Sequence, residues 1–114
     1  MSRLALRSHY WGVLVVVVAS GDLNAEGADV LEDYLHRVQA GNDIVVDLWD
    51  VTSCDPEGVA ILEANKKRWE EAGWGFAVVA DPDGPCNDAI TAVGTATIVT
   101  FADRHAARAA LANS

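Results

Sequence analysis

Cysteine, proline, methionine and basic residues are all scarce in this sequence. Its 114 residues include two cysteines, Cys54 and Cys86, three prolines and one methionine. Two cysteines outside any Cys-x-x-Cys spacing are too few for a secreted disulfide framework, and they do not indicate structural zinc. We therefore expect a cytoplasmic chain with reduced thiols and with no metal or other cofactor.

Acidic residues outnumber basic ones. Eight Lys and Arg residues stand against 17 Asp and Glu residues, which gives a formal net charge of −9 at pH 7. The phosphates of nucleic acids and the anionic headgroups of membranes repel such a chain. The composition argues against a nucleic-acid partner and leaves a protein surface of basic or mixed charge as a suitable one.

Long hydrophobic runs are also lacking. The run Val13–Ala19 is far too short to span a bilayer. Arg3 and Arg7 precede it and imitate a secretory signal, but His9 and Gly12 interrupt the approach. Because the β-branched run fits a buried strand, we expect neither a signal peptide nor membrane insertion.

One domain, residues 1–114, accounts for the whole chain. Independent domains usually contain roughly 100 to 200 residues, and no repeat or linker divides this sequence. Strands are predicted at Arg3–Ser8, Val13–Ala19, Ile44–Trp49, Gly75–Ala80 and Thr97–Val99, with Ser20–Asp22 ending the second strand. Helices are predicted at Ala25–Ala40, from the cap Asp55 to about Ala72, at Asn87–Val93 and at Asp103–Ala112.

The element order β-β-α-β-α-β-α-β-α predicts an α/β fold. Strands that alternate with helices need right-handed crossovers, so the sheet is mainly parallel, with an antiparallel first hairpin. The helix that begins near residue 56 has the clearest start signal: Asp55 as N-cap, Pro56 at the first helical position and Glu57 facing the positive end of the helix dipole.

Motifs typical of enzymes are absent from the sequence. There is no G-x-x-x-x-G-K-[ST] loop, no G-x-G-x-x-G after a strand and no G-x-S-x-G nucleophile turn. His9, His36 and His105 lie on three separate predicted elements without i, i+4 partners. We therefore expect a protein that is not an enzyme.

The carboxyl ends of parallel strands meet at one edge of a sheet. Asp22 follows the second predicted strand, Thr52–Glu57 the third and Asp81–Cys86 the fourth, so these segments are expected to lie together. Their content is acidic and hydroxylic and includes no basic residue. That composition suits a protein contact better than an anionic cofactor.

Three segments of the chain together form a recognisable pattern: VLVVVVASGDLN at residues 13–24, IVVDLWDVTSCDPEG at residues 44–58 and TIVTFADRHAARAAL at residues 97–111. This pattern resembles the STAS domain family, the fold of bacterial anti-sigma factor antagonists. The resemblance implies a non-catalytic regulator of transcription that binds an anti-sigma factor, often a serine-kinase-like protein, and thereby frees a sigma factor. It also implies a partner-binding surface formed by the exposed face of the helix to Glu71 and by Asp22, Asn24, Ser53, Asp55, Pro56, Glu57 and Gly58.

The sequence departs from the family where its members carry a phosphorylated serine. That position is Pro56, which has no hydroxyl group, and the next serine is replaced by Glu57. Phosphorylation would add about −1.5 to −2 charge, whereas Glu57 supplies a permanent −1. Two hypotheses follow: a constitutively competent antagonist, or one locked in a phosphorylated-like form that binds weakly. A plain Pro-Glu helix start chosen for stability is the third interpretation, and Thr52 and Ser53 are candidate substitute acceptors.

The two cysteines suggest a second kind of control. Cys54 and Cys86 each stand close to the start of a predicted helix, on loops that leave neighbouring strands at the same sheet edge. A reversible Cys54–Cys86 disulfide is one hypothesis, and two unrelated small buried thiols are the other.

Alternative functions stay open. A STAS subunit of a membrane transport complex would use the same helix face to dock a nucleotidase subunit. A small-ligand-binding STAS module draws little support from loops that lack basic residues. The sequence is compatible with a monomer or a homodimer.

Overall fold

A computed structural model of the chain describes residues 3–38, 41–94 and 97–112. Strands and helices follow the predicted order. They are β1 (Ala5–Trp11), β2 (Leu14–Leu23), α1 (Ala25–Val38), β3 (Ile44–Cys54), α2 (Pro56–Glu71), β4 (Phe76–Val79), α3 (Pro85–Val93), β5 (Thr100–Phe101) and α4 (Arg104–Ala112).

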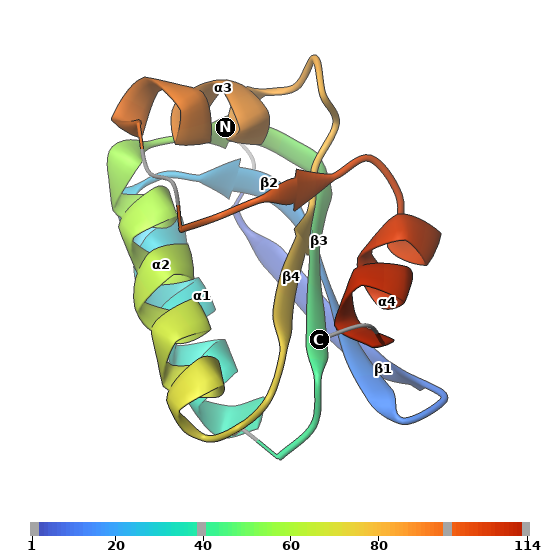
Figure 1. The fold of residues 1–114 in the computed structure, drawn as a ribbon. Coiled ribbons are helices and arrows are strands. Elements are labelled where there is room, and N and C mark those ends of the chain that lie inside the picture. Colours follow the sequence, from blue (N-terminus) through green and yellow to red (C-terminus); the bar gives the residue numbers. More distant parts are fainter. Residues whose placement is uncertain (1–2, 39–40, 95–96, 113–114) are drawn as a thin grey trace.

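The five strands form one mixed sheet in the order β1-β2-β3-β4-β5 (Figure 1). β1 pairs with β2 antiparallel, and each later pair of neighbours is parallel. The turn of the first hairpin contains Gly12, whose φ of 64° lies in the left-handed region that glycine adopts without strain. The predicted α/β fold is therefore confirmed, including the antiparallel first hairpin.

Helices cover both faces of the sheet, which explains why β2 and β3 are so apolar. Figure 1 shows α1 and α2 side by side on one face and α4 on the other. Alternate residues of β2 divide accordingly: Val15 and Val17 pack in a cluster with residues of α1, α2 and α3, whereas Val16 and Val18 pack with Ala107 and Leu111 of α4.

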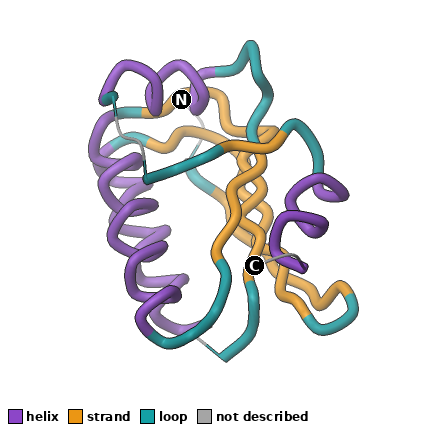
Figure 2. The backbone as a smooth tube through the Cα atoms, in the orientation of Figure 1, coloured by secondary structure: helices purple, strands orange, loops and turns teal. Residues whose placement is uncertain are grey.

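The hairpin turn lies beside α4 (Figure 2). The Trp11 ring meets the His105 ring edge to face at 5.3 Å, and the guanidinium carbon of Arg108 lies 4.7 Å from the Trp11 ring centroid. Aromatic and cation–π contacts of this kind attach the short C-terminal helix to the hairpin.

The local signals for α2 are confirmed. Asp55 is the N-cap in an extended conformation, and Pro56 occupies the first turn, although no hydrogen bond joins the Asp55 side chain to the helix. Trp69, fully buried, donates from its indole nitrogen to the Asn42 carbonyl at 2.9 Å. Gly73, with φ of 88°, follows the helix.

Several predicted strand ends are wrong. Ser20–Asp22 does not end the second strand: β2 continues to Leu23 and pairs with the end of β3 through two register shifts. Gly21, with φ of 96°, accommodates this irregular pairing. β3 likewise runs beyond Trp49 to Cys54, and β1 runs to Trp11 instead of ending at Ser8. Pairing with neighbouring strands extends these three strands, and the local sequence pattern carries no information about that pairing.

Two other boundaries differ from the prediction. The last strand is Thr100–Phe101 and not Thr97–Val99, because Thr100 and Phe101 are the residues that pair with Val78 and Val79 of β4. α3 begins at Pro85, so Cys86 lies inside its first turn and not before it. The predicted end of the first helix, residues 39–40, lies outside the described residues.

Candidate functional site

Two of the three strand ends that were expected to lie together are joined through Asp22. Its Oδ1 atom accepts hydrogen bonds from Thr52 Oγ1 at 2.8 Å and from Ser53 Oγ at 2.9 Å. The backbone adds a further link, since the Asp55 N–H donates to the Leu23 carbonyl at 2.9 Å. The end of β2 and the segment leading into α2 therefore form one hydrogen-bonded corner.

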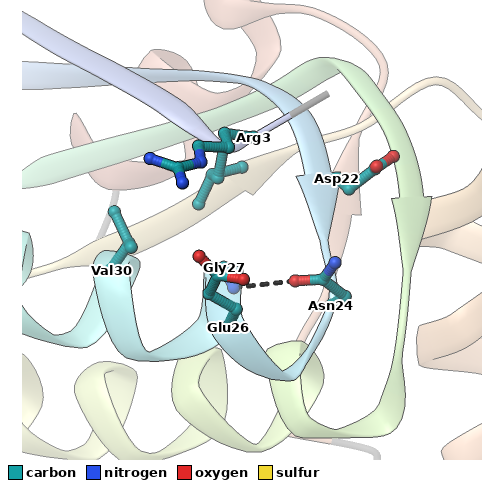
Figure 3. Close-up of a pocket in the computed structure, with 7 residues that line it drawn as sticks. Arg3, Asp22, Asn24, Glu26, Gly27 and Val30 are labelled. Carbon is teal, nitrogen blue, oxygen red and sulfur yellow. Dashed lines mark hydrogen bonds between the residues drawn. The ribbon is translucent and has the colours of Figure 1, made fainter. Parts of the chain in front are cut away.

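The start of α1 lies next to this corner. Asn24 Oδ1 accepts a hydrogen bond from the Gly27 N–H at 2.8 Å, so the Asn24 side chain caps the helix. Figure 3 shows this bond beside a shallow pocket of about 390 Å³. The pocket is lined by Arg3, Leu4, Asp22, Asn24, Glu26, Gly27 and Val30. One basic and two acidic side chains face it, a mixed charge that selects no single class of ion.

The first turn of α2 carries the residues that the resemblance assigns to partner binding. Pro56 and Glu57 are exposed, whereas Gly58 is buried and its N–H donates to the Asp55 carbonyl at 2.9 Å. A Cβ atom at Gly58 would lie 2.6 Å from Leu23 Cγ. Glycine therefore allows α2 to approach the end of β2 closely, a role that the sequence prediction missed.

An exposed stripe continues along α2 from this turn. The residues at helical spacing on its outer side are Pro56, Glu57, Ala60, Ala64, Lys67 and Glu71, and all six are exposed. Ala60 and Ala64 lack long side chains, so the middle of the stripe is flat. The charged residues lie toward its two ends. We call these six residues the α2 outer face.

The two thiols also meet at this corner. Cys54 is the last residue of β3 and packs against the core cluster that contains Cys86, which is 2% exposed. A hydrogen bond between their side chains is the main cause that lowers the pKa of Cys54. The same hydrogen bond, followed by burial, raises the pKa of Cys86. Cys54, the less buried of the two, is the thiol that ionises first.

One buried ion pair was not predicted. Asp47, in the middle of β3, is 7% exposed, and its Oδ2 atom accepts a hydrogen bond from Arg104 Nε at 2.6 Å. Its Oδ1 atom accepts from the Trp49 N–H at 3.0 Å. Because 57 residues separate Asp47 from Arg104, no local pattern indicates the pair. It holds α4 against the sheet, away from the Asp22 corner.

Two further observations bear on the chemistry of the described residues. Within residues 3–38, 41–94 and 97–112, no three His, Cys, Asp or Glu side chains gather in a metal-binding group. In the same part of the chain, no helix has both the length and the apolar character needed to cross a membrane.

The structure resembles solved STAS-type proteins. It superimposes on the crystal structure of an anti-sigma factor antagonist from Mycobacterium paratuberculosis with a TM-score of 0.84 and 24% identity, over 96% of this chain and 94% of that chain. The anti-sigma factor antagonist SpoIIAA in its unphosphorylated form gives a TM-score of 0.70 and 12% identity, over 90% and 92% of the two chains.

A transporter contains a similar domain. The murine anion transporter of solute carrier family 26, member A9, matches with a TM-score of 0.70 and 12% identity, over 100% of this chain and 23% of that chain. At these identities the likenesses establish the fold. No curated protein sequence matches the chain. The family model described as "Mlab, STAS domain" matches residues 12–100, which is most of the sequence. This protein therefore belongs to the STAS domain family.

Proposed function

We propose that this protein is a non-catalytic regulator of the anti-sigma factor antagonist type, acting in the cytoplasm. Its partner is an anti-sigma factor, a serine-kinase-like protein, and binding controls the availability of a sigma factor. The observation that carries the proposal is the corner at Asp22, which joins the ends of β2 and β3 next to the exposed first turn of α2. The partner-binding surface consists of this corner and the α2 outer face.

The charge of the surface supports a protein partner. Asp22, Asp55 and Glu57 place three carboxylates around the first turn of α2, and the whole chain carries a formal charge of −9. Such a field accelerates encounter with a basic surface and repels polyanions. The flat middle of the α2 outer face gives a helix or loop of the partner room to approach closely.

Pro56 changes how binding is controlled. Members of the family that are regulated by phosphorylation carry a serine at this position, and Pro56 offers no hydroxyl group. We favour the constitutively competent form, because Glu57 carries one charge on an exposed side chain, less than the about −1.5 to −2 of a phosphate. The protein then binds its partner without waiting for a phosphatase.

The test uses the double variant Pro56→Ser/Glu57→Ser with a candidate kinase-type anti-sigma factor. We expect wild type to bind with or without ATP, and the double variant to bind and then dissociate once ATP is added. Tyr10→Ser adds a serine on β1, at the opposite end of β2, and is the matched control that should behave as wild type. No ATP-dependent change in the double variant would refute the view that Pro56 replaces a phosphorylated serine.

A STAS subunit of a membrane transport complex is the second candidate. The likeness to a domain of an anion transporter favours it. In that setting the α2 outer face would dock an ATPase subunit. Copurification with the native partner separates the candidates: a kinase-fold protein supports the regulator, an ABC-type ATPase supports the transport subunit, and a retained small molecule supports a ligand-binding module.

A further inference from the structure

We propose that Cys54 and Cys86 form a peroxide-responsive thiol pair, in which Cys54 reacts first and Cys86 closes a reversible disulfide. The placement of the two residues carries the inference. Cys54 ends β3 and Cys86 lies in the first turn of α3, and Figure 1 shows α3 lying across the end of the sheet at which β3 ends. Cys54 packs against the core cluster that contains Cys86, although 31 residues lie between the two in the sequence.

The two thiols differ in the way that such a pair requires. Cys54 is partly exposed, so an oxidant can reach it, whereas Cys86 is buried. The Cys86 hydrogen bond lowers the pKa of Cys54, which increases the thiolate fraction available to attack a peroxide. The Cys54 thiol donates a hydrogen bond to the Asp55 carbonyl oxygen at 3.8 Å, which fixes the position of its sulfur beside the start of α2.

The chemistry balances with hydrogen peroxide as the oxidant. The Cys54 thiolate sulfur attacks one peroxide oxygen, the O–O bond breaks, and the leaving hydroxide takes a proton to become water. This step leaves Cys54 as a sulfenic acid. The Cys86 sulfur then attacks the Cys54 sulfur, the S–O bond breaks, and a second water leaves with the Cys86 proton. Two thiols lose two electrons and two protons in all, and one peroxide becomes two waters.

The second step is favoured by the first. The hydrogen bond to Cys54 is the main cause of the raised pKa of Cys86, and charge on Cys54 contributes to it. Conversion of Cys54 to a neutral sulfenic acid removes that charge. A dithiol reductant reverses the bridge by thiol–disulfide exchange.

The bridge would alter the corner at Asp22. Cys54 stands between Ser53, which donates to Asp22, and Asp55, whose N–H donates to Leu23. Bringing the two sulfur atoms to the disulfide bond length of about 2.05 Å pulls Cys54 toward α3. This expectation rests on the proposed function: the oxidised protein should bind its partner at least tenfold more weakly than the reduced protein.

The first measurement is independent of any partner. The native protein is treated with hydrogen peroxide, denatured, alkylated with iodoacetamide and weighed by intact mass spectrometry. We expect wild type to lose two hydrogens and accept no alkyl group, and a dithiol reductant to restore two alkylation sites. Two thiols that stay alkylatable, or a Cys54 that gains two oxygens without a bridge, would overturn the proposal.

Single variants assign the roles. In Cys86→Ser, Cys54 should be trapped as a sulfenic acid that a dimedone probe labels. In Cys54→Ser, Cys86 should stay reduced and become alkylatable only after denaturation. Cys86→Ala serves as the second variant if serine at this buried position impairs folding. Equal peroxide reactivity of the two single variants would refute the order in which the thiols react.

Partner affinity is measured last, on reduced and oxidised wild type and on oxidised Cys54→Ser. A tenfold loss confined to oxidised wild type supports control of the binding surface by the bridge. A bridge that forms with unchanged affinity overturns that control. Reduced protein that does not bind an anti-sigma factor contradicts the proposed function alone, since the mass measurement still decides the thiol chemistry.

Discussion

Replacement of Gly58 by alanine tests whether close contact between α2 and β2 shapes the binding corner. Gly58 is buried in the first turn of α2, opposite the fully buried side chain of Leu23. An added Cβ would lie 2.6 Å from Leu23 Cγ, 2.9 Å from Leu23 Cδ2 and 3.3 Å from the Leu23 carbonyl oxygen. Leu23 Cγ is not the free end of its side chain, so the backbone of α2 or of β2 has to move.

The expected cost is the difference between two effects. Overpacking a core contact destabilises by about 1 to 3 kcal/mol. Alanine gains up to about 1 kcal/mol over glycine in a helix interior, and less in a first turn. We therefore expect Gly58→Ala to lower the free energy of unfolding by about 1 to 2 kcal/mol, which corresponds to a fall in Tm of roughly 5 °C or more.

Urea and thermal unfolding of Gly58→Ala and of three further variants measure this. Gly41→Ala is the matched control, because a Cβ at Gly41 meets nothing within 4 Å, and it should be neutral. Leu23→Ala removes the obstructing side chain and should cost about 2 to 5 kcal/mol by itself. In Gly58→Ala/Leu23→Ala the added methyl occupies part of the vacated space, so the double variant should be about 1 kcal/mol more stable than the sum of the single effects predicts.

The reasoning fails if Gly58→Ala is as stable as Gly41→Ala. It also fails if the effects of Gly58→Ala and Leu23→Ala are additive, because additivity would show that the two side chains do not compete for space. Either result would mean that glycine is not needed for the approach of α2 to β2.

Two further predictions concern stability. Arg104→Met leaves the buried Asp47 carboxylate without its ion-pair partner and should lower the free energy of unfolding by about 2 kcal/mol. The loss is smaller than for a fully buried pair because the Arg104 side chain is 35% exposed. In urea unfolding, Asp47→Asn/Arg104→Met should recover part of this stability. Because the pKa of Cys86 is raised, the folded protein retains a proton that the unfolded thiol loses near its ordinary pKa of 9.0. The free energy of unfolding under reducing conditions should therefore fall above pH 9.0, by at most about 1.4 kcal/mol per pH unit. The lowered pKa of Cys54 has its effect below pH 9.0. Its contribution to the free energy of unfolding is lost as the pH falls through the Cys54 pKa of the folded protein. In Cys86→Ser the fall in the free energy of unfolding above pH 9.0 should disappear. If the fall is unchanged, groups other than Cys86 cause it.

Local signals in the sequence predicted the helices better than the ends of the strands. Pro56 and Gly73 bound α2 because a fixed φ and a left-handed residue act within a few positions. The end of β2 depends instead on its pairing with β3, about 30 residues later, which turns an apparent stop at Ser20–Asp22 into irregular strand. Local propensity depends on a residue's neighbours along the chain, whereas the end of β2 depends on its pairing with a distant strand.

The sequence predicted which segments of the candidate site lie close together, but not the contacts between their side chains. Topology alone indicated that Asp22 and the segment Thr52–Glu57 would meet, and the hydrogen bonds from Thr52 and Ser53 to Asp22 confirm it. That Asp22 accepts both hydroxyls at one oxygen atom, and that a glycine at position 58 faces Leu23, depends on the register shifts between β2 and β3. Those shifts arise from tertiary packing and have no local sequence signal.

The corner is better suited to control by oxidation than by phosphorylation. Thr52 and Ser53 both donate to Asp22, so a phosphate on either hydroxyl would place about −1.5 to −2 charge beside a carboxylate that repels it. Glu57 carries a charge that no modification removes. A disulfide carries no charge, so oxidation of Cys54 adds no repulsion at the start of α2. Its effect on partner binding then comes from the position of Cys54 and persists at salt concentrations that screen surface charge.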